Sequence, residues 1–413
     1  MSLISTFFAP FAVRSYRFQW PSDLATSIGF EMEALILGWY VLNATGSVEW
    51  LVAFGALPWL GAIFAPFLGI AGDRLGLRTM LWTSRAGYAL LAGTLTTLTV
   101  TGALTPVQVF VLYGITGLMR PSDTAMRSVL IAQTAAPATL MGALGLSRTT
   151  GDMAKVLGSL AGAGGVALIG MGPAYVVVTL LYVSAFLLAL GLARPPLHAA
   201  HASAHDVLTG LKEATRYVWK KPDLFGAFLI AFIGNLLAFP FVLGIMPYAA
   251  KEIYRVGQAG LGYLAAAFAL GALAGSLMVG ANMMRVAAGR MMLWSCAAWF
   301  IAVILFGQTR SFAFGFALLF LSGLMQSLCL TPLAAVMLRG SSLEMRGRVM
   351  GMRVLAVWGL PLGLLATGPL IAHLGFLACT TLYGSLGLAA TVAIGYRCRH
   401  DLWDRSAPAN SHA

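Results

Sequence analysis

Three carboxylic acids, Asp23, Glu31 and Glu33, stand in one apolar stretch near the N-terminus. An ionisable residue inside a membrane span is costly, so it tends to face protein or water and to be functional. A carboxyl group shielded from water can load and release a proton near neutral pH, which suits a proton-coupled carrier. At 3.6 residues per turn, Glu31 and Glu33 point about 200° apart, so at most one faces a given cavity. We predict that at least one of them carries a proton or contacts substrate. The alternative is that one permanently pairs with an arginine and the other lies near the interface.

Two later segments carry charges of alternating sign at helical spacing. Each series shares one helix face, and the members are Arg120, Asp123 and Arg127, then Arg148, Asp152 and Lys155. Because sequential helices are usually neighbours, the two series could pair across a buried seam in a purely structural role. Arg120 is the best candidate for direct function, since it lies deepest and could attract an anionic group. Asn235 and Gln326 are further candidates for hydrogen bonds to a substrate.

These side chains must be held by long apolar helices. Of the 413 residues 59% are hydrophobic and 10% are charged, and the mean hydropathy is +0.84. A soluble domain of this composition would aggregate, whereas a bilayer core of about 30 Å is crossed by about 20 apolar residues in a helix. Lipid accepts only helices or closed barrels as spans, so we predict an all-α integral membrane protein. Twelve stretches qualify, with approximate ends at 20–43, 47–71, 79–101, 106–130, 140–169, 173–192, 224–248, 259–281, 289–308, 311–338, 346–372 and 376–396.

Basic residues gather in alternate loops, and loops rich in Lys and Arg stay in the cytoplasm. This bias predicts that both termini are cytoplasmic. The membrane that we expect is a bacterial inner membrane. The charge bias also accounts for the net charge of +12, so nucleic acid is not expected as a partner and a basic face on anionic lipid is sufficient. The longest polar interruption, residues 194–223, divides the chain into a first half (1–193), a linker with an amphipathic helix, a second half (224–396) and a tail (397–413).

A charged turn between the second and third stretches carries a family resemblance. It reads Gly69-Ile-Ala-Gly-Asp73-Arg74-Leu-Gly76-Leu-Arg78 and resembles the G-x-x-x-D-R-x-G-R-[RK] signature of the major facilitator superfamily. The resemblance implies twelve transmembrane helices in two pseudo-symmetric six-helix halves, with a substrate path between them. It also implies a gating role for Asp73, although Leu77 replaces the usual arginine.

Further stretches are similar to the drug-and-siderophore efflux branch of that superfamily, which includes macrolide and enterobactin exporters. Arg346-Gly-Arg348-Val-Met-Gly351 and Gly359-Leu-Pro361-Leu-Gly363 resemble elements around its eleventh helix. Gly158-Ser-Leu-Ala-Gly162 is similar to the G-P-x-x-G of exporters, with Ser159 in place of proline; small residues four apart also favour plain helix packing.

Together these patterns favour export of a small amphipathic compound by proton antiport, as a monomer within the lipid bilayer. A proton-coupled uptake symporter and a lipid flippase remain alternatives, and an enzyme is not expected because no span carries a nucleophile elbow or a metal pattern. The proton gradient is the expected energy source, with no cofactor or metal. His198, His201 and His205 favour a solvated linker over a metal site, because they lie beside Pro195-Pro196.

Overall fold

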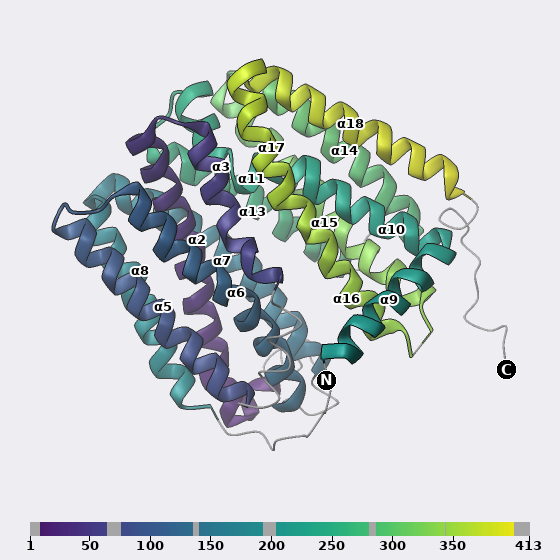
Figure 1. Cartoon of the computed structure of the whole chain (residues 1–413), viewed down its shortest axis with the longest axis horizontal. Helices are drawn as coiled ribbons and strands as arrows, with labels where there is room; N and C mark the ends of the chain where they lie inside the picture. Colours follow the sequence, from purple (N-terminus) through teal and green to yellow (C-terminus); the bar gives the residue numbers. More distant parts are fainter. Residues whose placement is uncertain are drawn as a thin grey trace. The chain divides into compact units, whose positions relative to one another are not determined.

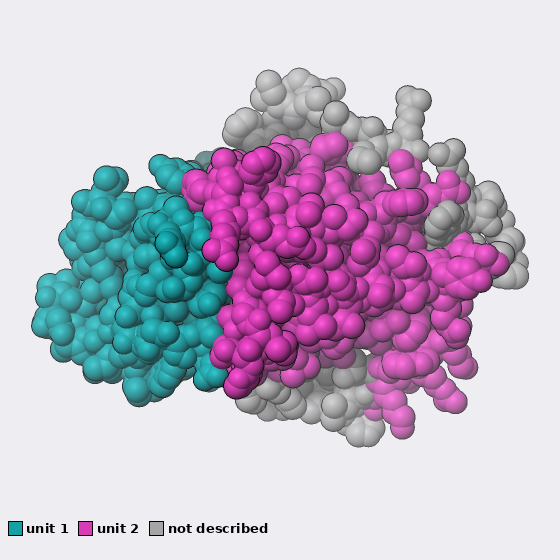
Figure 2. All heavy atoms as spheres, turned by 90° about the horizontal axis from the view of Figure 1, so that it is seen from above, with its two compact units in different colours: residues 1–207, 244–269 teal, residues 208–243, 270–413 magenta. Residues whose placement is uncertain are grey.

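A computed structural model describes residues 9–63, 76–134, 140–192, 204–280, 286–342 and 344–399. The chain divides into two compact units (Figure 2). Unit 1 consists of Met1–Val207 and Gly244–Ala269, and unit 2 of Leu208–Leu243 and Leu270–Ala413. The expected linker contains the first of these boundaries, but residues 244–269 fall in unit 1 although the sequence placed them in the second half. The division into two halves at 194–223 therefore stays a prediction.

Unit 1 is built on the long helix α2, whose main neighbours are α7 and α8 (Figure 1). Its elements are η1 (Ala9–Ala12), α2 (Arg14–Thr45), α3 (Val48–Ala56), η2 (Leu57–Ile63), α5 (Leu77–Val100), α6 (Pro106–Thr134), α7 (Leu140–Ile169), α8 (Met171–Leu190), α12 (Met246–Tyr248), η4 (Ala249–Ile253) and the first half of α13 (Gln258–Gly280). Helix α2 makes its most extensive contacts with α7 and α8, and smaller ones with α3, α6 and α12.

Unit 2 pairs α14 with α15 and α18, which Figure 1 shows side by side. Its elements are α9 (Ala204–Lys220), α10 (Pro222–Ile233), η3 (Gly234–Ala238), α11 (Phe239–Leu243), α14 (Ala288–Gln308), α15 (Phe312–Gly340), α16 (Arg346–Leu355), η5 (Ala356–Trp358), α17 (Gly359–Leu374) and α18 (Phe376–Arg397), together with the end of α13. Two expected spans are interrupted here: 224–248 contains a π-helical turn at η3, and 346–372 contains a 3₁₀ turn at η5.

Eight helices in the described parts are long and apolar enough to cross a bilayer, judged by length and composition alone. They correspond to the last eight of the twelve expected stretches. Helices α2, α5 and α6 fall short because acids, arginines and threonines lower their hydropathy, and the second expected stretch is described only as far as residue 63. The charged side chains that weaken these three helices as membrane spans are the ones that form the site described below.

Small residues bring α7 against α2. A β-carbon added at Gly158 would lie 2.6 Å from the β-carbon of Glu31, and one added at Gly162 would lie 2.8 Å from the α-carbon of Met32. Real β-carbons do not approach so closely, so only glycine permits this contact. The expected close packing of the Gly158–Gly162 segment is present, and it places Glu31 at the α2–α7 interface.

The amphipathic helix expected within the linker 194–223 is α9, and it docks on the turn between α15 and α16. The Glu213 carboxylate pairs with Arg348, and the Tyr217 hydroxyl accepts from the Ser342 amide at 3.1 Å. The ammonium group of Lys221 donates to the Gly340 carbonyl at 2.8 Å. These bonds attach the linker helix to unit 2.

The close α2–α7 contact predicts a sharp difference between two glycines of α7. Gly162→Ala should lower the free energy of unfolding by about 1–3 kcal/mol, because its methyl group would collide with the α2 backbone. Gly164→Ala is the matched control, since nothing lies within 4 Å of a β-carbon there. The measurement is the thermal unfolding midpoint of both variants in detergent. Equal midpoints would contradict the packing.

Candidate functional site

The centre of the site in unit 1 is a buried arginine that sequence reasoning did not single out. Arg85 of α5 is fully buried and donates to the Asp23 carboxylate and the Ser22 hydroxyl, both on α2. Its Nε lies 3.4 Å from the Oδ1 of Asp123 on α6. One guanidinium thus connects three helices. The rule that selected Arg120 also applies to Arg85, which lies inside the expected span 79–101.

A second arginine completes this ion cluster, which consists of Asp23, Arg85, Asp123 and Arg127. The Nη2 of Arg127 lies 2.5 Å from the Oδ2 of Asp123, one helical turn away, and its Nε lies 3.5 Å from the Oδ1 of Asp23. Arg127 also donates to the Ser27 hydroxyl at 2.8 Å. Two acids and two bases give no net charge. The four side chains can be buried only because their charges balance, since an unpaired charge in a low-dielectric interior is far more costly than a paired one.

Glu33 occupies a different side of α2 and is 1% exposed. Its two carboxylate oxygens accept from the hydroxyls of Tyr175 and Tyr182 on α8, at 2.6 Å and 2.8 Å. Gly29 permits this approach, because a β-carbon there would lie 2.9 Å from the Tyr182 ring. The acid is therefore enclosed in the aromatic core of the unit with both oxygens bonded.

Glu31 faces α6 and is partly open to solvent. Its Oε1 lies 4.0 Å from the Nη2 of Arg120, and the two side chains are 28% and 27% exposed. The Arg120 guanidinium also lies 4.7 Å from the centre of the Phe30 ring. The 200° separation expected for the two glutamates is thus seen in the structure: Glu33 is enclosed by α8, while Glu31 forms a loose, accessible ion pair with α6.

The second charge series pairs within its own helix. The Oδ2 of Asp152 lies 3.4 Å from the Nε of Arg148, and its Oδ1 lies 3.1 Å from the Nζ of Lys155. In the described parts of the chain no ion pair joins these residues to α6. The seam between the two series that the sequence suggested is replaced by pairing of the α6 series with α2 and α5, because Arg85 and Asp23 supply closer partners.

The signature turn is described only in part. Gly69, Asp73 and Arg74 lie outside the described residues. Gly76 has φ 84°, a conformation that favours glycine, and it precedes α5. The guanidinium of Arg78 donates to the Leu190 carbonyl at the end of α8 at 2.7 Å. A cation at a helix C-terminus is favourable there.

The two candidates in unit 2 lie on separate helices. Asn235 belongs to the π-helical turn η3 and donates to the Ala231 carbonyl at 2.9 Å, and Gln326 is buried in α15. A β-carbon at Gly359 would lie 2.7 Å from the Phe232 carbonyl, so α17 closely contacts the segment that leads into this turn. π-helical turns are frequent at functional sites.

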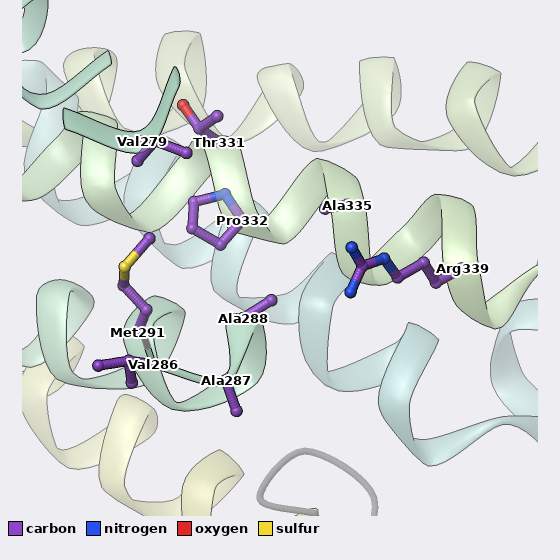
Figure 3. Close-up of a pocket in the computed structure, with 9 residues that line it drawn as sticks. All are labelled: Val279, Val286, Ala287, Ala288, Met291, Thr331, Pro332, Ala335 and Arg339. Carbon is purple, nitrogen blue, oxygen red and sulfur yellow. The ribbon is translucent and has the colours of Figure 1, made fainter. Parts of the chain in front are cut away.

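Unit 2 also contains a cavity of about 320 Å³ near the ends of α13, α14 and α15. Its lining is mostly apolar, with Thr331 and Arg339 as polar members, and Figure 3 shows Arg339 extending from α15 toward the other lining residues. None of the residues selected from the sequence lines it. Among the residues that the structure describes, no group of three or more His, Cys, Asp or Glu side chains is arranged to hold a metal ion.

Comparison with known proteins assigns the chain to a family. The Major Facilitator Superfamily profile matches residues 2–259, more than half of the chain. The chain belongs to the major facilitator superfamily. No curated protein matches its sequence. As a member of this superfamily it is a multi-pass membrane transporter rather than an enzyme, and its all-helical structure fits the superfamily fold of twelve transmembrane helices in two six-helix halves.

Solved structures of other transporters share this fold at low sequence identity. A bacterial homologue of the human lysosomal transporter Spinster, inward-facing and unoccupied, has a TM-score of 0.72 and 14% identity over 95% of this chain and 99% of its own. The nucleoside transporter NupG has a TM-score of 0.73 and 14% identity over 92% and 98%. A D-xylose–proton symporter has a TM-score of 0.72 and 12% identity over 91% and 96%. At such low identities, these structures show only that the chain shares the superfamily fold.

The ion cluster of this major facilitator protein predicts a strong effect of one substitution. Arg85→Met should lower the free energy of unfolding by about 3–5 kcal/mol, because it leaves two buried acids with a single cation. Arg148→Met is the control, since that arginine is 61% exposed and its removal should leave stability near the wild-type value. Thermal unfolding in detergent tests both variants. An Arg85→Met protein as stable as Arg148→Met would refute a structural role for the cluster.

Proposed function

We propose that this chain exports a small amphipathic compound, drug-like or siderophore-like, across a bacterial inner membrane by proton antiport. The observation that carries the proposal is the partly exposed pair of Glu31 and Arg120 on facing helices of unit 1. Among the described residues, it is the most exposed of the ion pairs that join two helices of unit 1. A pair that is both intramembrane and accessible can respond to a proton and to a ligand.

In this proposal the Arg120 guanidinium binds Glu31 and the substrate in turn. When Glu31 is ionised, its carboxylate attracts Arg120, and both charges are compensated. When Glu31 takes up a proton, the attraction is lost and a polar or anionic group of a substrate can compete for the guanidinium of Arg120. Proton and substrate therefore compete for the same pair, and such competition is what antiport requires. The apolar surroundings, with Phe30 beneath Arg120, suit an amphipathic ligand.

Glu33, on the other side of α2, contributes to transport through the contact between α2 and α8. Both of its oxygens are bonded to tyrosines of α8, so a change in its protonation would alter the α2–α8 contact. Because Glu31 and Glu33 lie on one helix, a movement of α2 caused by protonation of either acid would alter its contacts with both α6 and α8. We assign the exchange of protons for substrate to Glu31, and the control of the position of α2 to Glu33.

Two sequence features that resemble the efflux branch form close helix contacts in the structure, and these contacts support the proposal. The Gly158–Gly162 segment packs on α2 beside Glu31, as an exporter segment would, and Gly359 lets α17 approach α10. One observation favours the alternative, a proton-coupled uptake symporter: where exporters have proline, Ser159 retains its backbone N–H, and α7 runs without a break from Leu140 to Ile169.

The proposal predicts that Glu31→Gln abolishes proton flux driven by substrate. In proteoliposomes, with siderophores and amphipathic drugs as probes, wild-type protein should change the internal pH when a transported probe is added on one side. Glu31→Gln should give the signal of protein-free vesicles, because an amide cannot exchange a proton. Glu49→Gln is the matched control, since Glu49 is an exposed acid at the start of α3. Normal proton flux in Glu31→Gln would overturn the mechanism.

The direction of transport is tested in whole cells. Export predicts that deletion of the gene raises the cellular content of a transported probe, because the outward route is lost. Uptake predicts that deletion lowers it. Complementation with the wild-type chain and with Glu31→Gln separates proton-driven movement from leakage, and a lower content after deletion would replace export by the symport alternative.

A further inference from the structure

The cavity in unit 2 has the size and lining of a small-molecule site. Its volume of about 320 Å³ is near the lower limit of the range typical of ligand pockets, about 300–1,000 Å³. Such pockets are mostly apolar with a few polar groups. Met291 of α14, Pro332 and Ala335 of α15 and Val279 of α13 belong to the apolar lining. All of the lining residues belong to unit 2, so the cavity is a feature of this unit alone.

Arg339 brings a positive charge to the cavity. Its side chain is exposed, and in the part of the chain that the structure describes it makes no hydrogen bond or ion pair. It is not needed to cap the end of α15 either. Arg346 donates to the Leu338 carbonyl at 3.1 Å. Lys221 donates to the Gly340 carbonyl at 2.8 Å. The guanidinium of Arg339 is therefore available to a ligand, and its planar fork matches a carboxylate or a phosphate.

The start of α14 contributes another wall of the cavity. Ala287 is the N-cap of this helix and Ala288 is its first residue, and both line the cavity. An N-cap side chain usually accepts from the first amides of its helix, but alanine has no oxygen with which to do so. These amides lack partners within the helix and carry the positive end of its dipole. A negatively charged group in the cavity is therefore favoured by the amide of Ala288 as well as by Arg339.

The charge and the apolar lining are separated along α15. Thr331, Ala335 and Arg339 are four residues apart, so they share one face of the helix. Arg339 lies about 12 Å beyond Thr331 along the helix axis, at about 1.5 Å per residue. Figure 3 shows Arg339 at one end of the lining, with Ala335 and then Pro332 leading away from it. A ligand that fits this arrangement has an anionic group at one end and an apolar body behind it.

We propose that this cavity binds a small single-chain amphipathic anion. Its carboxylate or phosphate would bind Arg339 and the amide of Ala288, and its apolar chain would lie along Ala335 and Pro332. The small volume favours one chain over the two of a bilayer phospholipid. The charge bias of the loops predicts that this end of α15 faces the cytoplasm, so the ligand would enter from that side. The site belongs to a different unit from the acid–arginine pair proposed for transport, and it does not depend on proton coupling.

The test measures binding of decanoate, a carboxylate with one unbranched chain, to the full chain in nanodiscs of neutral phosphatidylcholine. Wild-type protein should bind decanoate saturably above the level of empty nanodiscs. Arg339→Gln should weaken this binding by about tenfold or more, because it removes the charged donor to the anion. Arg310→Gln is the matched control, since Arg310 is also exposed but precedes α15 at the other end of the helix.

Ala335→Phe tests the apolar part of the site while it keeps the charge of Arg339. Its ring should occupy the cavity and weaken decanoate binding, and the thermal unfolding midpoint checks that the variant is folded. Wild-type affinity in Arg339→Gln or in a folded Ala335→Phe protein would overturn the proposal. Equal losses in Arg339→Gln and Arg310→Gln would also overturn it, because they would reflect a general attraction of anions to basic surface.

Two further arms separate this site from bilayer lipid and from transport. In nanodiscs that contain phosphatidylglycerol, the difference between wild type and Arg339→Gln should persist. Its disappearance would mean that a bilayer lipid occupies the cavity, and would overturn the proposed ligand. Glu31→Gln should bind decanoate like wild type, because Glu31 belongs to unit 1. Loss of proton coupling in that variant therefore leaves this site standing, and failure of decanoate binding leaves the antiport proposal standing.

Discussion

The structure of unit 1 depends on one constraint, the free-energy cost of moving charged side chains out of water. Helix α2 cannot bury Asp23 in an apolar interior unless neighbouring helices supply cations, and Arg85 and Arg127 supply them from α5 and α6. The cost of an isolated buried charge is much larger than the cost of a compensated group of four. The relative positions of these three helices are therefore set by where each one carries its charged side chain.

Once the cluster holds α2 against α5 and α6, the remaining faces of α2 are defined. Glycines at 158 and 162 bring α7 within backbone contact, and the tyrosines of α8 enclose Glu33. Glu31 is the acid that none of these contacts seals. Its loose pairing with Arg120 is a consequence of the same packing, which satisfies every other charge of α2 in the span more tightly.

The second unit shows a different solution, because most of its described helices are apolar enough to span a bilayer without buried ion pairs. The π-helical turn at η3 and the 3₁₀ turn at η5 interrupt two spans, and Gly359 allows the segments that carry them to touch. Unit 1 also has irregular turns, at η2 and η4, and in addition it contains the ion pairs that join α2 to α5 and α6.

The sequence by itself determined the class of this protein. Apolar stretches of spanning length predicted most of the helices, and the opposite directions of Glu31 and Glu33 followed from helical periodicity alone. It could not determine which charge meets which. Arg85 was overlooked although it lies mid-span. The α7 series, which by its spacing could have paired with α6, pairs within its own helix. Periodicity fixes the face of a helix on which a side chain lies, whereas the partner on that face depends on how neighbouring helices are rotated and offset. The tertiary structure decided this through close glycine contacts and through the need to give every buried acid either a cation or hydrogen-bond donors, and so it decided that Glu33 is enclosed and Glu31 is accessible.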